Sequence, residues 1–304
     1  SGSDRGGGGG GGRHQVMNLA AFYGYVDVVA WLRARGCEYN AWTCSSAAEG
    51  GHIATMEWMV RDGCRMDHWA AACAARGGHL PVLKWMRERE AAAAGEAGHG
   101  DHGGHRVGSF GWSSIQCTFA ASGGHVDVLE WLVTEAGCPL IERTAAEAAK
   151  ENRLDVLGWL ESRRCPWGAS VTAAAAAEGH LAALKFLRKK GCPWDASCCG
   201  RAAAGGHLEV LKWARENGCE WDEATTRNAA TFGQLAALKW ARKRKGACPW
   251  DEEDVVSCAA AGGHVCILRW AIEEEGCACT DSTLCWKAAR AGQLEALQYL
   301  RERH

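Results

Sequence analysis

A Gly-His-Leu-like step recurs along this chain at a period near 27 residues, and this repeat constrains the fold more than any other feature. The clear copies are centred at His52, His79, His125, His180, His207 and His264, and the degenerate copies at Tyr25, Arg153, Gln234 and Gln293. A fixed period between about 20 and 50 residues is typical of a solenoid, in which each unit buries its apolar face by stacking on its neighbours. The sequence therefore predicts one repeat array, although its length alone would suggest about two domains.

Each repeat reads as two helices joined by a glycine turn. In the copy around His207, a short alanine-rich stretch ends at Gly205-Gly206, and a second stretch with apolar residues at helical spacing ends at Gly218. Every copy has Ala-Ala shortly before the landmark, and an aromatic residue six positions after it. We interpret these invariant aromatics as packing between stacked second helices, since a surface for stacking bases or ligands would vary between copies.

The pattern resembles the ankyrin repeat. Ala202-Ala203, Gly206-His207, Leu208 to Leu211 and Gly218-Cys219 fall at matching places of the ankyrin consensus. The resemblance covers residues 17–304 and implies an all-α solenoid of about ten helix pairs. The period is about six residues short of the usual 33, and loops such as 192–195, Cys-Pro-Trp-Asp, replace the β-hairpin fingers, which we expect to be shortened or absent. Similar short repeats are abundant in stramenopile algae and large DNA viruses.

Two segments fall outside the repeat. Residues 1–16 contain a run of glycines and are predicted to be disordered. Residues 88–110 form an insertion rich in Gly, Ala and His, which we predict to be a flexible surface loop. His99, His102 and His105 with Asp101 could bind a transition metal, but a glycine-rich segment is poorly preorganised for one, so we expect no metal or other cofactor.

The 17 cysteines do not indicate a disulfide framework. Eight of them occupy one repeat position, at the end of the second helix: Cys37, Cys64, Cys138, Cys165, Cys192, Cys219, Cys248 and Cys277. Neighbouring repeats place equivalent positions about 8–10 Å apart, beyond the roughly 7 Å limit for a disulfide. Abundant free cysteine and the lack of a visible signal or membrane-spanning segment predict a cytoplasmic or nuclear protein.

No catalytic motif is apparent, so the sequence does not predict an enzyme. The net charge of −2 gives no general attraction to nucleic acid or membranes, and we interpret basic runs such as 188–190 and 242–245 as solvated helix ends. We expect a monomeric, non-enzymatic scaffold that binds a protein partner. The alternatives are a metal- or redox-responsive binding protein that uses the cysteines and the His-rich insertion, or the targeting arm of a larger protein, because both ends of the chain look truncated.

The candidate binding residues directly follow the Ala-Ala pair and vary between repeats. They are Phe22, Glu49, Arg76, Ser122, Lys150, Thr231 and Arg290. In the ankyrin family this position faces the concave groove, so the resemblance implies a concave binding face here. Ala177, Ala204 and Ala261 occupy the same position in other repeats and predict a smooth centre. We expect the charged members of the set to orient a partner over that centre.

Overall fold

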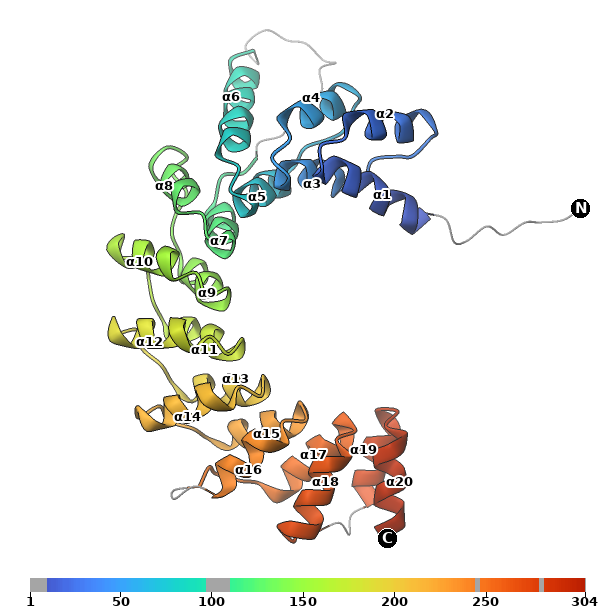
Figure 1. Cartoon of the computed structure of the whole chain (residues 1–304), viewed down its shortest axis with the longest axis vertical. Coiled ribbons are helices and arrows are strands. Elements are labelled where there is room, and N and C mark those ends of the chain that lie inside the picture. Colours follow the sequence, from blue (N-terminus) through green and yellow to red (C-terminus); the bar gives the residue numbers. More distant parts are fainter. Residues whose placement is uncertain (1–9, 97–109, 244–246, 279–281, 304) are drawn as a thin grey trace, which may run out of the picture. The chain divides into compact units, whose positions relative to one another are not determined.

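The computed structural model describes residues 10–96, 110–243, 247–278 and 282–303. Within these ranges the chain forms 20 α-helices and no strand (Figure 1). The helices belong to two compact units, Ser1–Ala148 with Asp155–Cys165 (unit 1) and Ala149–Leu154 with Pro166–His304 (unit 2). The predicted all-α fold of helix pairs is confirmed, and the described loops between repeats contain no β-hairpin finger.

Each repeat contributes a first helix with an odd label and a second helix with an even label. The first helices are α1 (Gly10–Phe22), α3 (Thr43–Glu49), α5 (His68–Gly77), α7 (Ser114–Gly123), α9 (Glu142–Lys150), α11 (Ala169–Ala177), α13 (Ala196–Ala204), α15 (Glu223–Thr231), α17 (Glu252–Gly262) and α19 (Ser282–Arg290). The second helices are α2 (Val26–Ala34), α4 (Ile53–Arg61), α6 (Leu80–Glu96), α8 (Val126–Thr134), α10 (Leu154–Ser162), α12 (Leu181–Lys189), α14 (Leu208–Glu216), α16 (Leu235–Lys243), α18 (Val265–Arg269) and α20 (Leu294–Arg303).

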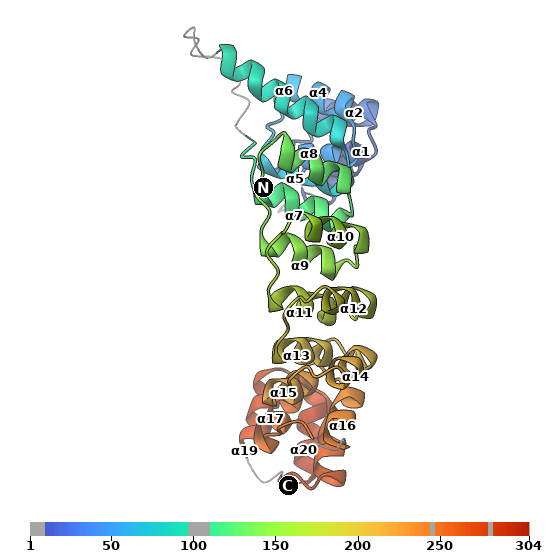
Figure 2. The same ribbon diagram turned by 90° about the vertical axis from the view of Figure 1, so that its left-hand side faces the viewer.

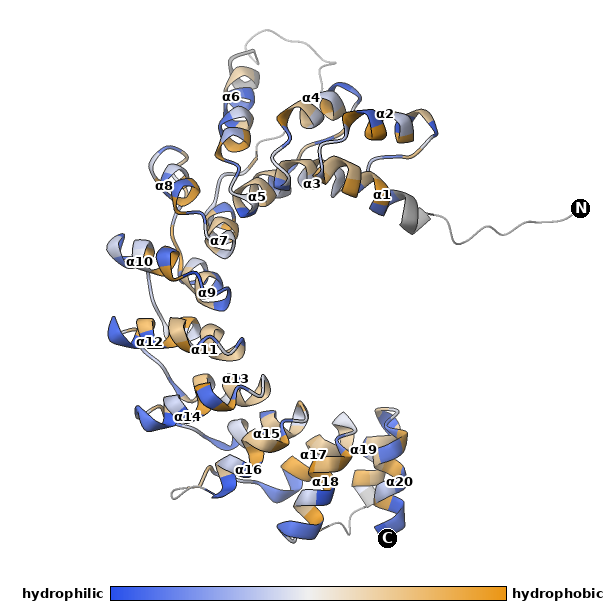
Figure 3. Ribbon diagram, in the orientation of Figure 1, coloured by the Kyte–Doolittle hydropathy of each residue, from blue (hydrophilic) through white to orange (hydrophobic). Residues whose placement is uncertain are grey.

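The core of each unit lies between its first and second helices. Successive first helices pack directly on one another, from α1 to α7 in unit 1 and from α11 to α19 in unit 2 (Figure 2). The Ala-Ala pairs are buried, as at Ala202 and Ala203, except that Ala289 of the last repeat is exposed, and their small side chains let these helices approach closely. Each second helix covers its own first helix with aliphatic residues such as Val210 and Leu211. In Figure 3 the second helices α12 and α14 are accordingly hydrophilic at their outer ends.

Glycines in the left-handed region end the helices, as at Gly206 (φ 73°) and Gly218 (φ 85°). After Gly218, the Cys219 amide donates to the Ala214 carbonyl at 2.9 Å, which completes a Schellman cap. One repeat, around Arg153, departs from this rule at both of its turns, because Asn152 (φ 54°) and Arg164 (φ 55°) adopt the left-handed conformation without being glycine. Arg164 carries backbone strain there, whereas asparagine tolerates this conformation better.

The repeat around His264 contains one more residue before its cysteine than the standard copy. The structure accommodates it as a π-helical turn, Trp270–Glu274, that continues α18. A π-turn is a usual way to absorb a single inserted residue inside a helix. The flanking repeat contacts are kept, since Trp270 remains buried.

The two segments outside the repeat are more helical than predicted. Helix α1 begins at Gly10, so residues 10–16 of the expected tail are helical and lead into the buried Met17. Helix α6 continues to Glu96, so residues 88–96 of the expected loop are also helical. The run of alanines at 91–94 favours this extension, because alanine is the strongest helix former. The candidate ligands at 99, 101, 102 and 105 lie outside the described residues.

The chain returns from the insertion at Phe110, which is fully buried. Its amide donates to the Glu90 carboxylate at 3.1 Å, and the Trp112 indole donates to the same carboxylate at 2.5 Å. The extended part of α6 therefore has a packing role, because it holds the end of the insertion against unit 1. No helix in the described ranges combines the length and the apolar character needed to cross a membrane.

Candidate interaction surface

The seven predicted binding residues all lie at the end of a first helix. Their side chains are exposed or half-buried, whereas the alanines before them are buried, apart from the exposed Ala289. The set is Phe22, Glu49, Arg76, Ser122, Lys150, Thr231 and Arg290. Backbone and helix packing thus present this position on the first-helix face of each unit. Partner binding by these residues stays a prediction.

In unit 1, Phe22 borders a hollow of about 360 Å³ whose other lining residues include Leu19 and Ser46. Leu19 and Trp42 nearby are more than half exposed, at 54% and 55%. The ring centroid of Trp42 lies 6.1 Å from that of Trp69, which in turn lies 5.9 Å from Phe119. We call this surface the aromatic face, and it consists of Leu19, Phe22, Trp42, Trp69, Ile115 and Phe119.

Sequence reasoning found Phe22 but missed the rest of the aromatic face. Leu19 precedes Phe22 by three residues, and Trp42 and Trp69 precede Glu49 and Arg76 by seven. Residues three or seven apart share one side of a helix. The missing signal was therefore present, and extending the variable position along the helical period would have revealed it.

Glu49 and Arg76 come together at the edge of the aromatic face. The Arg76 Nε lies 3.8 Å from Glu49 Oε1, so the two form an ion pair between neighbouring repeats. Exposed pairs of this kind contribute little stability, but each side chain lowers the net charge that the other presents. The expectation that these charged residues help to orient a partner stays a prediction.

In unit 2, Lys150 borders a hollow of about 390 Å³ across three first helices, which we call the basic pocket. Its lining is Lys150, Ser170, Ala173, Ala174, Ala177, Glu178, Ser197 and Arg201. Ala177 lies in the pocket lining, and the smooth centre expected from Ala177, Ala204 and Ala261 stays a prediction. The pocket has two cationic side chains and one carboxylate, and no described ion pair involves Lys150 or Arg201. Arg201 was missed, although it precedes Ala204 by only three residues.

The remaining predicted residues line neither hollow. The Thr231 hydroxyl donates to the Arg227 carbonyl of its own helix at 2.9 Å. The Arg290 guanidinium lies 5.2 Å from the centroid of the exposed Trp286 ring. Ser122 is half-buried beside the aromatic face. The structure therefore divides the predicted set among several local environments.

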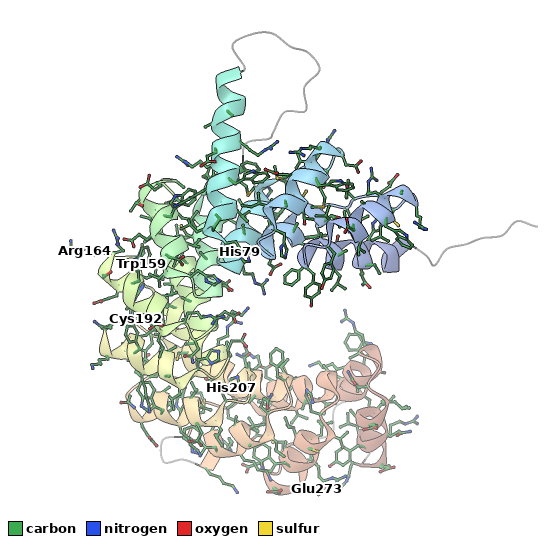
Figure 4. All side chains as sticks on the ribbon, turned by 45° about the horizontal axis from the view of Figure 1, so that its top comes forward. His79, Trp159, Arg164, Cys192, His207 and Glu273 are labelled. Carbon is green, nitrogen blue, oxygen red and sulfur yellow. The ribbon has the colours of Figure 1, made fainter. Side chains whose placement is uncertain are left out.

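Landmark histidines join several repeats to the preceding one. His207 Nε2 donates to the carbonyl of Ala177 at 3.0 Å, and His264 Nε2 does the same to Thr231 at 2.9 Å. The ring also fills the space above a glycine of the preceding repeat, since a Cβ added at Gly179 would lie 2.5 Å from His207 Nδ1. These histidines, of which His207 is labelled in Figure 4, have a structural role.

The basic residues at the ends of the second helices are also engaged. The Arg188 guanidinium lies 4.1 Å from the centroid of the Trp194 ring and donates to the Cys192 carbonyl at 2.5 Å. Trp194 in turn contacts Trp213 of the next repeat edge to face, with centroids 6.0 Å apart. Similar contacts join Arg215 to Trp221 and Arg242 to Trp250. These arginines organise the loops, and the repeated tryptophans are half-buried between them.

The cysteines at the repeat position are free, and all except the half-buried Cys37 are buried. Several donate to the carbonyl before the first helix of their own repeat, such as Cys248 to Asp222 at 3.2 Å. Burial raises the pKa of Cys248 to about 12, so this thiol stays protonated. Across the described ranges, no group of three or more His, Cys, Asp or Glu side chains is placed to hold a metal ion.

Residues 172–215, which form α11 through α14 with the intervening loops, match the family model described as ankyrin repeats (many copies). The same helix pair recurs in both units of the chain. No curated protein matches the chain.

Proposed function

The chain carries ankyrin repeats, which generally act as protein–protein interaction modules, and we propose that it is a non-enzymatic scaffold whose first-helix face binds a protein partner. The aromatic face is the observation that supports this most. Packing within unit 1 leaves the Trp42 side chain 55% exposed and the Leu19 side chain 54% exposed. Contiguous apolar patches on a monomer commonly mark interaction sites, and tryptophan is enriched among residues that dominate binding energy.

The chemistry of the two surfaces suggests the character of the partner. An apolar side chain of the partner would fill the hollow beside Phe22, where Leu19 offers further apolar contact. In unit 2, an acidic side chain would pair with Lys150 and Arg201 in the basic pocket, above a floor of alanines. We therefore propose a partner with an apolar anchor for unit 1 and an acidic segment for unit 2.

The test begins with capture of partners from source-cell lysate by the intact chain, followed by affinity measurement with the purified partner. Trp42→Ala should weaken binding at least tenfold, since a truncated hot-spot residue costs about 2 kcal/mol or more. Trp31→Ala is the matched control, because Trp31 is 53% exposed but lies on the second helix α2. Equal losses for the two variants, or no loss for Trp42→Ala, would contradict the proposed face.

The basic pocket is tested separately. Lys150→Glu and Arg201→Glu should each weaken the same complex, and more strongly at low ionic strength, because charge pairing is screened by salt. Lys189→Glu changes an exposed lysine at the end of α12 and should have little effect. Arg76→Glu should also weaken binding if the edge of the aromatic face is covered. Unchanged affinity of the Lys150 and Arg76 variants would show that the partner does not span these positions.

A further inference from the structure

Two thiols meet inside the repeat around His52. The Sγ atoms of Cys44 and Cys64 are 2.9 Å apart, and both side chains are buried. Cys44 lies in the first turn of α3, and Cys64 lies in the loop that follows α4. Both residues belong to the same repeat, so the spacing that keeps cysteines of neighbouring repeats apart does not apply to them.

The same arrangement recurs in two further repeats. Cys117 and Cys138 hold the same two positions in the repeat around His125, and Cys199, with Cys198 beside it, and Cys219 hold them in the repeat around His207. The neighbouring thiol raises the pKa of Cys117, Cys198 and Cys199, and the Cys219 thiol also donates to the Asp195 carbonyl at 3.3 Å. In each case one thiol comes from the first helix and the other from the repeat position after the second helix.

Packing alone does not demand the second cysteine. Eight residues before the landmark, the position of Cys44 and Cys117, other repeats have Ala145 or Thr172. In those repeats the thiol after the second helix donates to a backbone carbonyl, as Cys192 does to Gly168 at 3.6 Å. The sequence therefore contains repeats in which a first-helix cysteine accompanies the cysteine after the second helix, and repeats in which alanine or threonine stands in its place.

We propose that the Cys44–Cys64, Cys117–Cys138 and Cys198/Cys199–Cys219 clusters are sites of reversible disulfide formation, with a peroxide as the oxidant. A disulfide bond is about 2.05 Å long, so the sulfurs of Cys44 and Cys64 need to move less than about 1 Å closer. In the third cluster, either first-helix thiol can serve as the partner of Cys219.

The reaction balances as a two-electron oxidation of two thiols. The Cys64 thiolate attacks one peroxide oxygen, the O–O bond breaks, and the departing hydroxide takes up the thiol proton to become water. The Cys44 sulfur then attacks the Cys64 sulfenic acid, its proton leaves with the hydroxyl group as a second water, and the S–S bond forms. Hydrogen peroxide is thus reduced to two waters. A small-molecule dithiol reverses the oxidation by exchange.

The contacts assign the order of these steps. The close contact with the Cys44 thiol lowers the pKa of Cys64 and favours its thiolate, the reactive form. The neighbouring first-helix thiols likewise lower the pKa values of Cys138 and Cys219. Because these side chains are buried, oxidation requires local opening of the loop and should be slower than oxidation of the exposed Cys266.

The test treats the reduced full chain with hydrogen peroxide, alkylates the remaining thiols and maps the peptides without reduction. We expect three intramolecular cross-links, between residues 44 and 64, 117 and 138, and 219 and 198 or 199, all removed by dithiothreitol. Cys248 should not appear in any cross-link, because its thiol donates to the Asp222 carbonyl and lies against Thr225.

Variants separate the pairs from general oxidation. Cys44→Ser should abolish the cross-link of Cys64 and leave the other two, while Cys73→Ser changes a buried cysteine that has no thiol contact among the described residues and should leave all three. The proposal is overturned if Cys266 is oxidised while the three clusters remain fully reduced. It is also overturned if the clusters yield only sulfinic or sulfonic acids, or cross-links to other partners.

Discussion

His207→Ala removes one joint between repeats and allows its strength to be measured. The variant loses the hydrogen bond from Nε2 to the Ala177 carbonyl, worth about 1 kcal/mol net. It also loses the ring that covers Gly179, and the apolar area that the half-buried ring removes from water adds roughly 0.5–1 kcal/mol. We therefore expect the free energy of unfolding to fall by about 1.5–2 kcal/mol.

The chain offers its own conservative replacement. At the equivalent position Gln234 lies over Gly206, with its Oε1 2.3 Å from where an added Cβ would stand. A glutamine can therefore occupy the space of the histidine ring, and we expect His207→Gln to lose roughly half as much stability as His207→Ala. Urea unfolding followed by circular dichroism gives both values, and hydrogen exchange should show faster opening of residues 169–217.

The comparison between the two variants decides whether the reasoning holds. If His207 stabilises the chain through its contact with the preceding repeat, His207→Gln must lose less unfolding free energy than His207→Ala. Equal losses of unfolding free energy in the two variants would mean that His207 stabilises only the turn of its own repeat. A neutral His207→Ala would mean that the joint is held by the alanine pairs alone. Because the stability of a solenoid is approximately a sum of repeat and interface contributions, the loss should also remain local.

Three further predictions concern the backbone, pH and the loops. Arg164→Gly should raise the free energy of unfolding of unit 1 by about 0.5–1 kcal/mol in urea, because relief of about 1–2 kcal/mol of left-handed strain exceeds the roughly 0.5–1 kcal/mol entropic cost of glycine. Gly191→Arg, the reverse change at the equivalent position of unit 2, should lower the free energy of unfolding, and a destabilised Arg164→Gly variant would refute the strain at Arg164. Burial lowers the pKa of His79, so the folded state favours the neutral form of this side chain. The stability that neutral His79 contributes is fully present above the usual pKa near 6.5 and is lost as the pH falls through the lowered pKa of the folded state. His79→Gln should flatten the fall in stability between pH 8 and 5, and an unchanged slope would exclude this residue as a source. Arg188→Ala should lower stability by about 1–2 kcal/mol through loss of its carbonyl hydrogen bond and its contact with a tryptophan ring, whereas Lys189→Ala should change little; equal melting temperatures for the two variants would argue against the loop contact.

The repeat architecture was predictable because each copy has the same residue types at the same helix and turn positions. Ala202-Ala203 permits close helix contact, Gly206 permits the turn, and Leu211 lies on the buried side of the second helix. Ten imperfect copies of one pattern average out the local ambiguity that a single copy would have. The same regularity marked the histidines as structural before their hydrogen bonds were known.

The departures were harder to predict because they depend on contacts between segments. The extension of α6 through residues 88–96 is held by Glu90, whose carboxylate receives two donors from beyond the insertion. The pairing of Arg76 with Glu49 depends on the distance between neighbouring repeats, which sequence spacing does not give.

The candidate surface was predictable only in part. The variable position after Ala-Ala identified Phe22 and Lys150, which border the two hollows. Trp42 and Arg201 were missed because only one variable position per repeat was compared, although residues three and seven positions earlier lie on the same face of the first helix. The variable side of a repeat is a stripe along the first helix, and its chemistry becomes visible when every position on that stripe is compared.

The histidine joint has an evolutionary consequence. A standard repeat supplies a side chain to the repeat before it and a glycine to the repeat after it, as His207 does over Gly179 and Gly206 does under Gln234. Both halves of the joint are encoded within one period, so duplication or loss of a whole period restores a matched ring and glycine. An insertion between repeats need not break the joint, since His125 reaches the Arg76 carbonyl at 2.9 Å and covers Gly78 from beyond the insertion that follows α6. Gene rearrangement can therefore change the number of repeats in whole steps, and natural selection can then adjust the exposed stripe without redesigning the joint.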